Sequence, residues 1–272
     1  MNIAFWSNQL CERGTETALY DYAYHNKHIL GNKSYIFYEA KNRNNKQAIV
    51  KKFCDEFEVF PVEKFSDVDP ILSEKKISHI FIEKSGQNDG KISKIAKNCI
   101  HCVFNCTQPH GEVYAALSPN LLGNEGKYPV VPYMIDLPLH NENMRNKLNI
   151  PTDSIVFGGY GGPYQFDIEY VHRAVYEHAL RNPNVYFLFA NFRQFCPPCS
   201  NIIHLPMITD VHEKVKFINT CDAMIWGRSE GETFGLSIAE FSTLNKPIIA
   251  SKIGHNKGDF RHVELLGDKG IW

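Results

Sequence analysis

Two glutamates, Glu232 and Glu240, lie eight positions apart near the end of the 272-residue chain. A carboxylate accepts hydrogen bonds from two hydroxyl groups at once, which suits recognition of a sugar or ribose diol. Eight helical residues rise about 12 Å, roughly the reach from a ribose across a diphosphate to a sugar. The spacing therefore predicts a site for an extended, hydroxyl-bearing ligand. If the spacing is considered alone, the simpler explanation is a solvent-exposed helix in which glutamate is a common residue without a binding role.

The residues around this pair predict a βαβ unit. Residues 223–227 are short and apolar, as expected of a buried parallel strand. A short helix covers 236–241 and ends before Pro247, and a second strand covers 248–250. Ligands of such sheets bind beyond the carboxyl ends of the strands, where residues 228–236 lie.

The segment between the glutamates is a candidate anion site. Residues 234–236 enter the predicted helix, and the first amides of a helix have no partner within it. Such amides attract phosphate groups. Gly235 would let a phosphate come close to the backbone.

Residues 230–240, followed by 246–251, closely resemble the donor-site signature of retaining GT-B glycosyltransferases. This nucleotide-sugar-dependent group includes sucrose, trehalose and bacterial surface-glycan enzymes. The resemblance implies that Glu232 contacts the transferred sugar as a catalytic residue and that Glu240 holds the nucleotide ribose. It also implies that the amides of residues 234–236 lie at the diphosphate. The predicted donor-binding residues of this segment are Arg228, Thr233, Phe234, Gly235, Leu236 and Glu240.

The family usually places an Arg and a Lys just after the first strand of the second domain, where they neutralise the diphosphate. Residues 157–166 contain neither. Gly159 and Gly161 could instead let the backbone approach a nucleotide, and a base could stack near Tyr160. The missing charge could come from Arg228, Lys252 or Arg13.

Short apolar strands alternate with longer mixed segments along the whole chain, which is typical of an α/β parallel sheet. Residues 132–138 resemble the interdomain crossing of the same family. We therefore expect a GT-B fold, with two Rossmann-like doubly wound domains facing a cleft: residues 1–134 for the acceptor and 135–272 for the donor. The predicted strands are 3–6, 34–38, 59–62, 79–82, 102–105, 114–117, 130–134, 155–158, 185–190, 202–205, 223–227 and 248–250. The predicted helices are 16–29, 46–57, 70–76, 168–181, 211–220 and the short one from 236.

Two loops of the first half are further candidates. Arg13, Gly14 and Thr15 follow the first strand and resemble the glycine-containing turn that faces the donor, or the cleft, in many family members. Alternatively, Thr15 caps the first helix and Gly14 relieves a tight turn. His110 lies in a loop where many members place a histidine against the donor sugar, so the resemblance implies a catalytic contact. A loop histidine without such a task is the alternative.

Composition predicts a soluble enzyme. The chain is 43% hydrophobic and 22% charged, with a formal net charge of −1, so no nucleic-acid partner is expected. No signal peptide precedes the first predicted strand, and no apolar run approaches membrane-spanning length. We therefore expect a cytoplasmic protein. Its oligomeric state is left open.

No metal or cofactor is expected besides the nucleotide-sugar substrate. Asp67 and Asp69 imitate the metal-binding D-x-D of the other glycosyltransferase fold. Asp69, directly before Pro70, fits a helix N-cap better. Four cysteines in two C-x2-C pairs could bind zinc, although reduced thiols are expected in a cytoplasmic chain: Cys99, Cys102, Cys196 and Cys199.

A basic stretch in the first half could contact a membrane. Residues 41–52 contain no acidic residue, and such a surface can rest on anionic lipid. The alternative, which we favour, is a solvated helix that packs Ile49, Val50 and Phe53 on the sheet. The basic residues are Lys41, Arg43, Lys46, Lys51 and Lys52.

The resemblance implies a hexosyl- or pentosyltransferase that moves a sugar from a UDP- or GDP-sugar to a hydroxyl acceptor on a glycan, lipid or protein. Configuration would be retained, with the departing diphosphate stabilised electrostatically and the sugar oriented by Glu232. Two alternatives stay open: a nucleotide-sugar epimerase, and a non-catalytic or partner-dependent nucleotide-sugar-binding subunit. The second is favoured by the missing basic pair and by a sequence that ends 32 residues after Glu240, where relatives normally continue.

Overall fold

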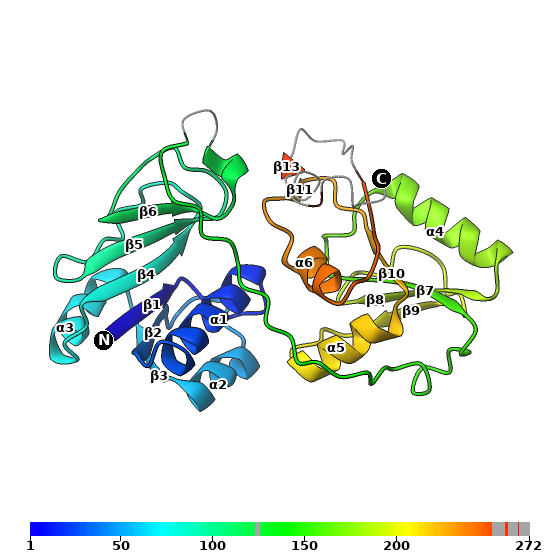
Figure 1. Ribbon diagram of the computed structural model, residues 1–272, viewed down its shortest axis with the longest axis horizontal. Helices are drawn as coiled ribbons and strands as arrows, with labels where there is room; N and C mark the ends of the chain where they lie inside the picture. Colours follow the sequence, from blue (N-terminus) through cyan, green and yellow to red (C-terminus); the bar gives the residue numbers. More distant parts are fainter. Residues whose placement is uncertain (123–125, 252–258, 261–265, 267–272) are drawn as a thin grey trace. The chain divides into compact units, whose positions relative to one another are not determined.

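The structure is a computed structural model that describes residues 1–122, 126–251, 259–260 and 266 (Figure 1). The chain divides into two compact units, Met1–Met134 and Ile135–Trp272. Each unit is built on its own parallel sheet.

The first unit alternates strands and helices. Its strands are β1 (Asn2–Ser7), β2 (Lys33–Glu39), β3 (Glu58–Val62), β4 (His79–Lys84), β5 (Lys97–Cys102) and β6 (Val113–Ala116). Its helices are α1 (Gly14–His28), α2 (Gln47–Glu56) and α3 (Val68–Glu74), with 3-10 turns η1 (Phe65–Asp67) and η2 (Pro119–Leu122). The sheet order β3-β2-β1-β4-β5-β6 is that of a Rossmann fold. The order reverses between β1 and β4, and ligands of such sheets bind beyond the carboxyl ends of the strands at this point.

The two faces of this sheet carry separate hydrophobic clusters. Helices α1 and α2 lie on one face of the sheet (Figure 1). There, Leu19 of α1 and Phe53 of α2 pack with Phe5 of β1. On the other face, Val68 and Leu72 of α3 pack with the remaining strand side chains. Strand side chains alternate between the faces, so one sheet serves both clusters.

The second unit repeats this plan. Its strands are β7 (Ile155–Tyr160), β8 (Val185–Ala190), β9 (Ile202–Leu205), β10 (Ala223–Trp226), β11 (Gly231–Glu232), β12 (Ile248–Ala250) and β13 (Asp259–Phe260). Its helices are α4 (Glu169–Arg181), α5 (Val211–Thr220) and α6 (Leu236–Thr243). The main sheet has the order β12-β10-β7-β8-β9, and its order reverses between β7 and β10. β11 and β13 pair separately.

The α/β class with two Rossmann-like domains is confirmed, and most predicted elements lie where expected. Two predicted strands are wrong. The predicted strand 102–105 is β5, which ends rather than begins at Cys102. In the predicted strand 130–134, only Val130 forms a bridge, to Ala116. Pro129 and Pro132 lack the N–H groups that a strand would need there.

Asp69 is not the N-cap of α3, because it lies inside the first turn of that helix. Its carboxylate instead accepts hydrogen bonds from the Ser93 hydroxyl at 2.6 Å and the Lys94 amide at 3.1 Å. The residue therefore ties α3 to the loop before β5, and the D-x-D pattern has a structural explanation.

A buried acid–base pair joins β4 and β5. Glu83 Oε1 lies 3.5 Å from His101 Nδ1, and the two side chains are 5% and 1% exposed. His101 Nε2 donates to the Val131 carbonyl at 2.8 Å, which leaves Nδ1 as an acceptor. Burial lowers the pKa of His101 to about 4 and raises the pKa of Glu83 well above its usual range. Both shifts favour the neutral forms, so the folded chain holds the Glu83 proton more tightly than the unfolded chain does.

We expect Glu83→Gln to change how stability depends on pH. Because the pKa of Glu83 is higher in the folded chain than in the unfolded chain, this residue lowers the stability as the pH rises above its ordinary pKa. The unfolding free energy of the variant, minus that of the wild type, should therefore increase from pH 5 to 8 by up to about 1.4 kcal/mol per unit. Denaturant unfolding measures this difference, with Glu63→Gln as the control, because the Glu63 side chain is 71% exposed. A difference that does not vary with pH would contradict a raised pKa of Glu83 in the folded chain.

Candidate functional site

The loops that follow β7 and β10 meet at the point where the strand order of the second unit reverses. Tyr160 is the last residue of β7, and Arg228 lies two residues after β10. Asp167 joins the two loops, because its carboxylate accepts from the Ser229 amide at 2.7 Å and hydroxyl at 2.6 Å. Its own amide donates to the Gly227 carbonyl at 2.9 Å. Asp167 thus fixes the Arg228 loop, a role that the sequence did not indicate.

Glu232 is paired with Arg228. The guanidinium Nη1 lies 2.8 Å from Glu232 Oε1, and Nη2 lies 3.1 Å from Glu230 Oε2. The Glu232 side chain is 15% exposed. Burial raises the pKa of Glu232, and the Arg228 charge opposes that rise. The pair therefore presents a largely desolvated carboxylate in a fixed position, close to a guanidinium.

Helix α6 begins directly after this pair. Gly235 is its N-cap with a left-handed φ of +80°, a conformation that favours glycine. The first α-helical hydrogen bond runs from the Ala239 amide to the Gly235 carbonyl at 2.9 Å. The amides of the first turn, from Leu236 on, point out of the helix end, where they can meet an anion. The left-handed backbone conformation therefore explains why residue 235 is a glycine, in addition to the predicted close approach of a phosphate.

Glu240 is buried on α6, with 6% of its side chain exposed. Its Oε1 accepts from Lys214 Nζ of α5 at 2.7 Å, and its Oε2 accepts from the Tyr160 hydroxyl. Burial and the neighbouring Glu240 charge raise the pKa of Tyr160 well above its usual range, so the hydroxyl stays a donor. Two donors therefore fix the carboxylate of the residue predicted to bind the ribose.

Close packing explains the predicted donor-site glycines after β7. A Cβ on Gly159 would lie 2.7 Å from the Ile225 carbonyl oxygen. A Cβ on Gly161 would lie 2.9 Å from Trp226 and from Phe192. The neighbouring protein therefore already requires glycine at both positions, and a close approach of a nucleotide to them stays a prediction.

The ring of Tyr160 lies in an aromatic cluster. It packs edge-on against Phe217 at 5.6 Å and next to Phe241 at 5.8 Å, measured between ring centroids. Its hydroxyl is bonded to Glu240. The structure therefore gives Tyr160 a supporting role for Glu240, and base stacking stays a prediction.

Thr233 and Phe234 lie between Glu232 and the start of α6, as expected. Lys252 lies outside the described residues.

The β1–α1 loop of the first unit is organised by a residue that we did not predict. Glu16 is 3% exposed, and its Oε1 accepts from Gln9 Nε2 at 2.8 Å. The Thr15 hydroxyl donates to Glu16 Oε2 at 3.0 Å instead of capping the helix, and Arg13 is the N-cap. The predicted Thr15 cap is therefore wrong. Arg13 and Gly14 are exposed at this helix end, beyond the carboxyl end of β1.

His110 belongs to a hydrogen-bonded network around Lys84. Its Nδ1 donates to the Gln108 carbonyl at 2.7 Å, so its Nε2 accepts from Lys84 Nζ at 3.2 Å. Lys84 also donates to Asp89 at 2.5 Å and to the Lys91 carbonyl at 2.9 Å. The structure thus gives His110 a place in the first unit's loop structure, and a contact with a donor sugar stays a prediction.

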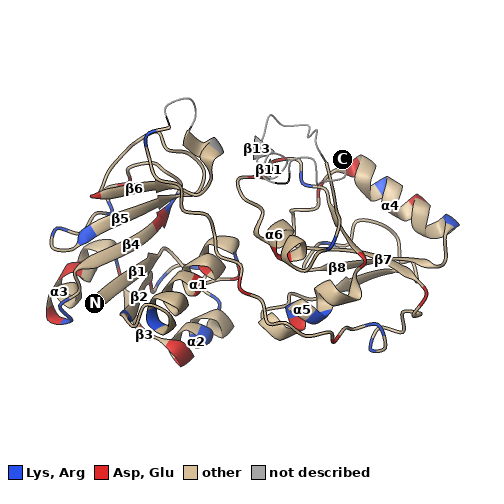
Figure 2. Cartoon of the chain, viewed as in Figure 1, with Lys and Arg blue, Asp and Glu red and all other residues tan. Residues whose placement is uncertain are grey.

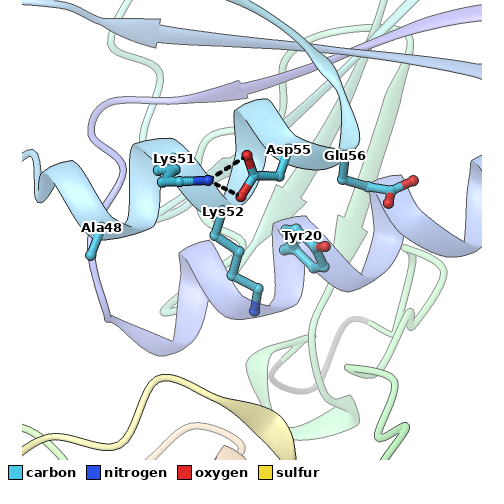
Figure 3. A pocket seen from close by; sticks show the side chains of 6 residues that line it. All are labelled: Tyr20, Ala48, Lys51, Lys52, Asp55 and Glu56. Atoms are coloured by element: carbon cyan, nitrogen blue, oxygen red, sulfur yellow. Dashed lines mark hydrogen bonds and ion pairs between the residues drawn. The ribbon is translucent and has the colours of Figure 1, made fainter.

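The basic stretch around α2 is not a purely basic surface. Figure 2 shows acidic and basic residues side by side on α2. Lys51 bonds to Asp55 at 2.7 Å, and Lys52 Nζ lies 4.2 Å from the centre of the Tyr20 ring, in a shallow pocket that Glu56 also lines (Figure 3). Ile49 and Phe53 are buried in the core beneath, as the favoured interpretation predicts. Buried in this way, they do not form an apolar face for a bilayer.

Over the described ranges, no group of three or more His, Cys, Asp or Glu side chains is arranged to bind a metal ion. The cysteines of both C-x2-C pairs are free thiols. No helix in the described part of the chain is long and apolar enough to cross a membrane.

Solved glycosyltransferase structures resemble the whole chain. One is a glycosyltransferase from Rickettsia africae, 15% identical, with a TM-score of 0.70 over 99% of this chain and 83% of that one. HepE from Anabaena, solved with UDP-glucose, is 14% identical, with a TM-score of 0.66 over 93% of this chain and 81% of its own. WaaG, a glycosyltransferase involved in lipopolysaccharide biosynthesis, is 11% identical, with a TM-score of 0.61 over 96% and 84%.

These similarities show that the chain has the GT-B fold, with two Rossmann-like domains. No protein-family model and no curated protein matches the sequence.

Proposed function

We propose that this protein is a glycosyltransferase that moves a hexosyl or pentosyl group from a nucleoside diphosphate donor to a hydroxyl acceptor. The observation that carries this proposal is the arrangement of Glu232 and Glu240 around the N-terminus of α6. Both carboxylates are largely buried and paired with cations, at the carboxyl ends of a Rossmann-type sheet. HepE, with the same fold, was solved with UDP-glucose.

The proposed roles follow the geometry of the second unit. Glu232 orients the transferred sugar, the first amides of α6 stabilise the departing diphosphate, and Glu240 binds the ribose. Configuration is retained and no metal takes part. The acceptor is a glycan, lipid or protein hydroxyl bound by the first unit, with Arg13, Gly14 and Thr15 as candidate contacts. His110 is the candidate first-unit contact to the donor sugar. The protein works in the cytoplasm, and a peripheral contact with anionic lipid would use the basic side chains of residues 41–52 and no apolar face.

The test is turnover of UDP-glucose, GDP-mannose and ADP-glucose with a panel of sugar and lipid-linked acceptors. We expect release of one nucleoside diphosphate that depends on an acceptor. The product should have the α-configuration of the donor, as observed by proton NMR. A β-linked product would contradict retention. A new nucleotide-sugar formed without an acceptor would identify an epimerase, and binding without turnover would identify a partner-dependent subunit.

A further inference from the structure

Lys214 lies at the same edge of the sheet as the proposed donor-site residues Glu240 and Tyr160. α5 starts beyond the carboxyl end of β9 and runs back to the start of β10, and Lys214 is its fourth residue. Glu240, its partner at 2.7 Å, is the fifth residue of α6, which follows the carboxyl end of β10. Tyr160, which holds the other oxygen of Glu240, is the last residue of β7. All three residues therefore lie at the edge where ligands of such sheets bind.

The contacts of Lys214 leave part of its bonding capacity for a ligand. An ammonium group has three protons to donate. Within the described part of the chain, Lys214 gives one to Glu240, and its side chain is 16% exposed. Lys216, two residues on, contrasts with it. That lysine is 28% exposed and contacts two carboxylates, Glu142 at 2.9 Å and Glu213 at 3.0 Å.

The diphosphate of a nucleotide needs positive charge close by, since its oxygens carry the negative charge that grows as the sugar leaves. The loop between β7 and α4, residues 161–168, contains no Lys or Arg and carries the acidic Asp167. Lys214 comes from a different helix, and its flexible stem lets the ammonium turn without leaving Glu240.

We infer that Lys214 binds the diphosphate of the nucleotide while it stays bonded to Glu240, so that one side chain connects the diphosphate and ribose subsites. This inference rests on the proposed function. A carboxylate has about four acceptor positions. Lys214 and Tyr160 take two of those on Glu240, which leaves two for the ribose hydroxyls. Tyr160 is a positioning residue in this arrangement.

The experiment is calorimetric titration with UDP, GDP and ADP and with the matching nucleosides uridine, guanosine and adenosine. It uses the wild type and the variants Lys214→Gln, Lys214→Arg and Lys216→Gln. For the nucleotide that the wild type binds, Lys214→Gln should weaken the binding of the diphosphate form about tenfold or more, because one hydrogen bond to a charged group is lost. Its affinity for the matching nucleoside should change little. Lys214→Arg should recover most of the affinity, and Lys216→Gln should match the wild type.

Other outcomes would overturn the inference in distinguishable ways. Equal weakening of diphosphate and nucleoside by Lys214→Gln would mean that the lysine acts only by orienting Glu240. Unchanged diphosphate binding would remove Lys214 from the site while leaving the proposed function in place. A wild type that binds none of these ligands would contradict the proposed function itself. Melting curves of each variant show that the compared chains are folded.

Discussion

Glu232→Gln is expected to lower the turnover of bound nucleotide-sugar about 100-fold, with little change in nucleotide affinity. The carboxylate is fixed by Arg228 at 2.8 Å and is 15% exposed, so its charge acts in a desolvated site. Glutamine keeps the shape but removes the charge and one of the acceptors that orient the sugar hydroxyls. The measurement is turnover at saturating donor, with nucleoside diphosphate release followed continuously.

Glu230→Gln is the matched control for this variant. Glu230 contacts the same guanidinium at 3.1 Å, but its side chain is 67% exposed. Because solvent screens an exposed ion pair, its loss should leave turnover close to wild type. If Glu230→Gln lowers turnover as much as Glu232→Gln does, the effect comes from a disturbed Arg228 loop, and the assignment of Glu232 to the sugar is wrong.

The second large effect is expected on binding. Glu240→Gln should weaken the binding of a nucleoside diphosphate and of its matching nucleoside by a similar factor, about tenfold or more. Both ligands of each pair, UDP and uridine or GDP and guanosine, contain the ribose. Turnover at saturating donor should fall less than in Glu232→Gln. The variant also leaves Lys214 without its anionic partner, which should lower the unfolding free energy by about 1–3 kcal/mol.

The control for this variant is Glu213→Gln on α5, which removes a carboxylate 3.0 Å from Lys216 and not from Lys214. Its side chain is 38% exposed, so both stability and nucleotide binding should stay close to wild type. A Glu240→Gln variant that binds nucleoside as well as the wild type does would contradict a ribose contact.

The sequence predicted the elements that local patterns specify. The strands at 185–190 and 202–205 and the helix at 211–220 have the predicted bounds, since short apolar runs and an Asp210 N-cap define them locally. The apolar residues of 130–134 predict a strand. The segment does not form one, because Pro132 within it and Pro129 just before it have no N–H group to donate to a neighbouring strand. Glu232 and Glu240 were found from their spacing and from a family resemblance.

The partners of those glutamates could not be predicted, because they depend on packing between distant elements. Lys214 is 26 residues from Glu240, and Tyr160 is 80 residues from it. Only the order β12-β10-β7-β8-β9 brings the three to one edge. The pairing of Glu83 with His101 likewise requires the register of β4 against β5, which places these two residues opposite each other.

The most direct test of the central claim is thermal unfolding with UDP-, GDP- and ADP-sugars, on the wild type, Glu240→Gln and Glu177→Gln. Glu177 is an exposed glutamate on α4 and serves as the control. A ligand at a hundred times its dissociation constant adds about 2.7 kcal/mol to the unfolding free energy. In a chain of this length, that raises the melting temperature by several degrees. The donor site predicts this rise with one nucleotide class, preserved in Glu177→Gln and lost in Glu240→Gln. No rise with any donor, or an equal rise in all three proteins, would contradict it.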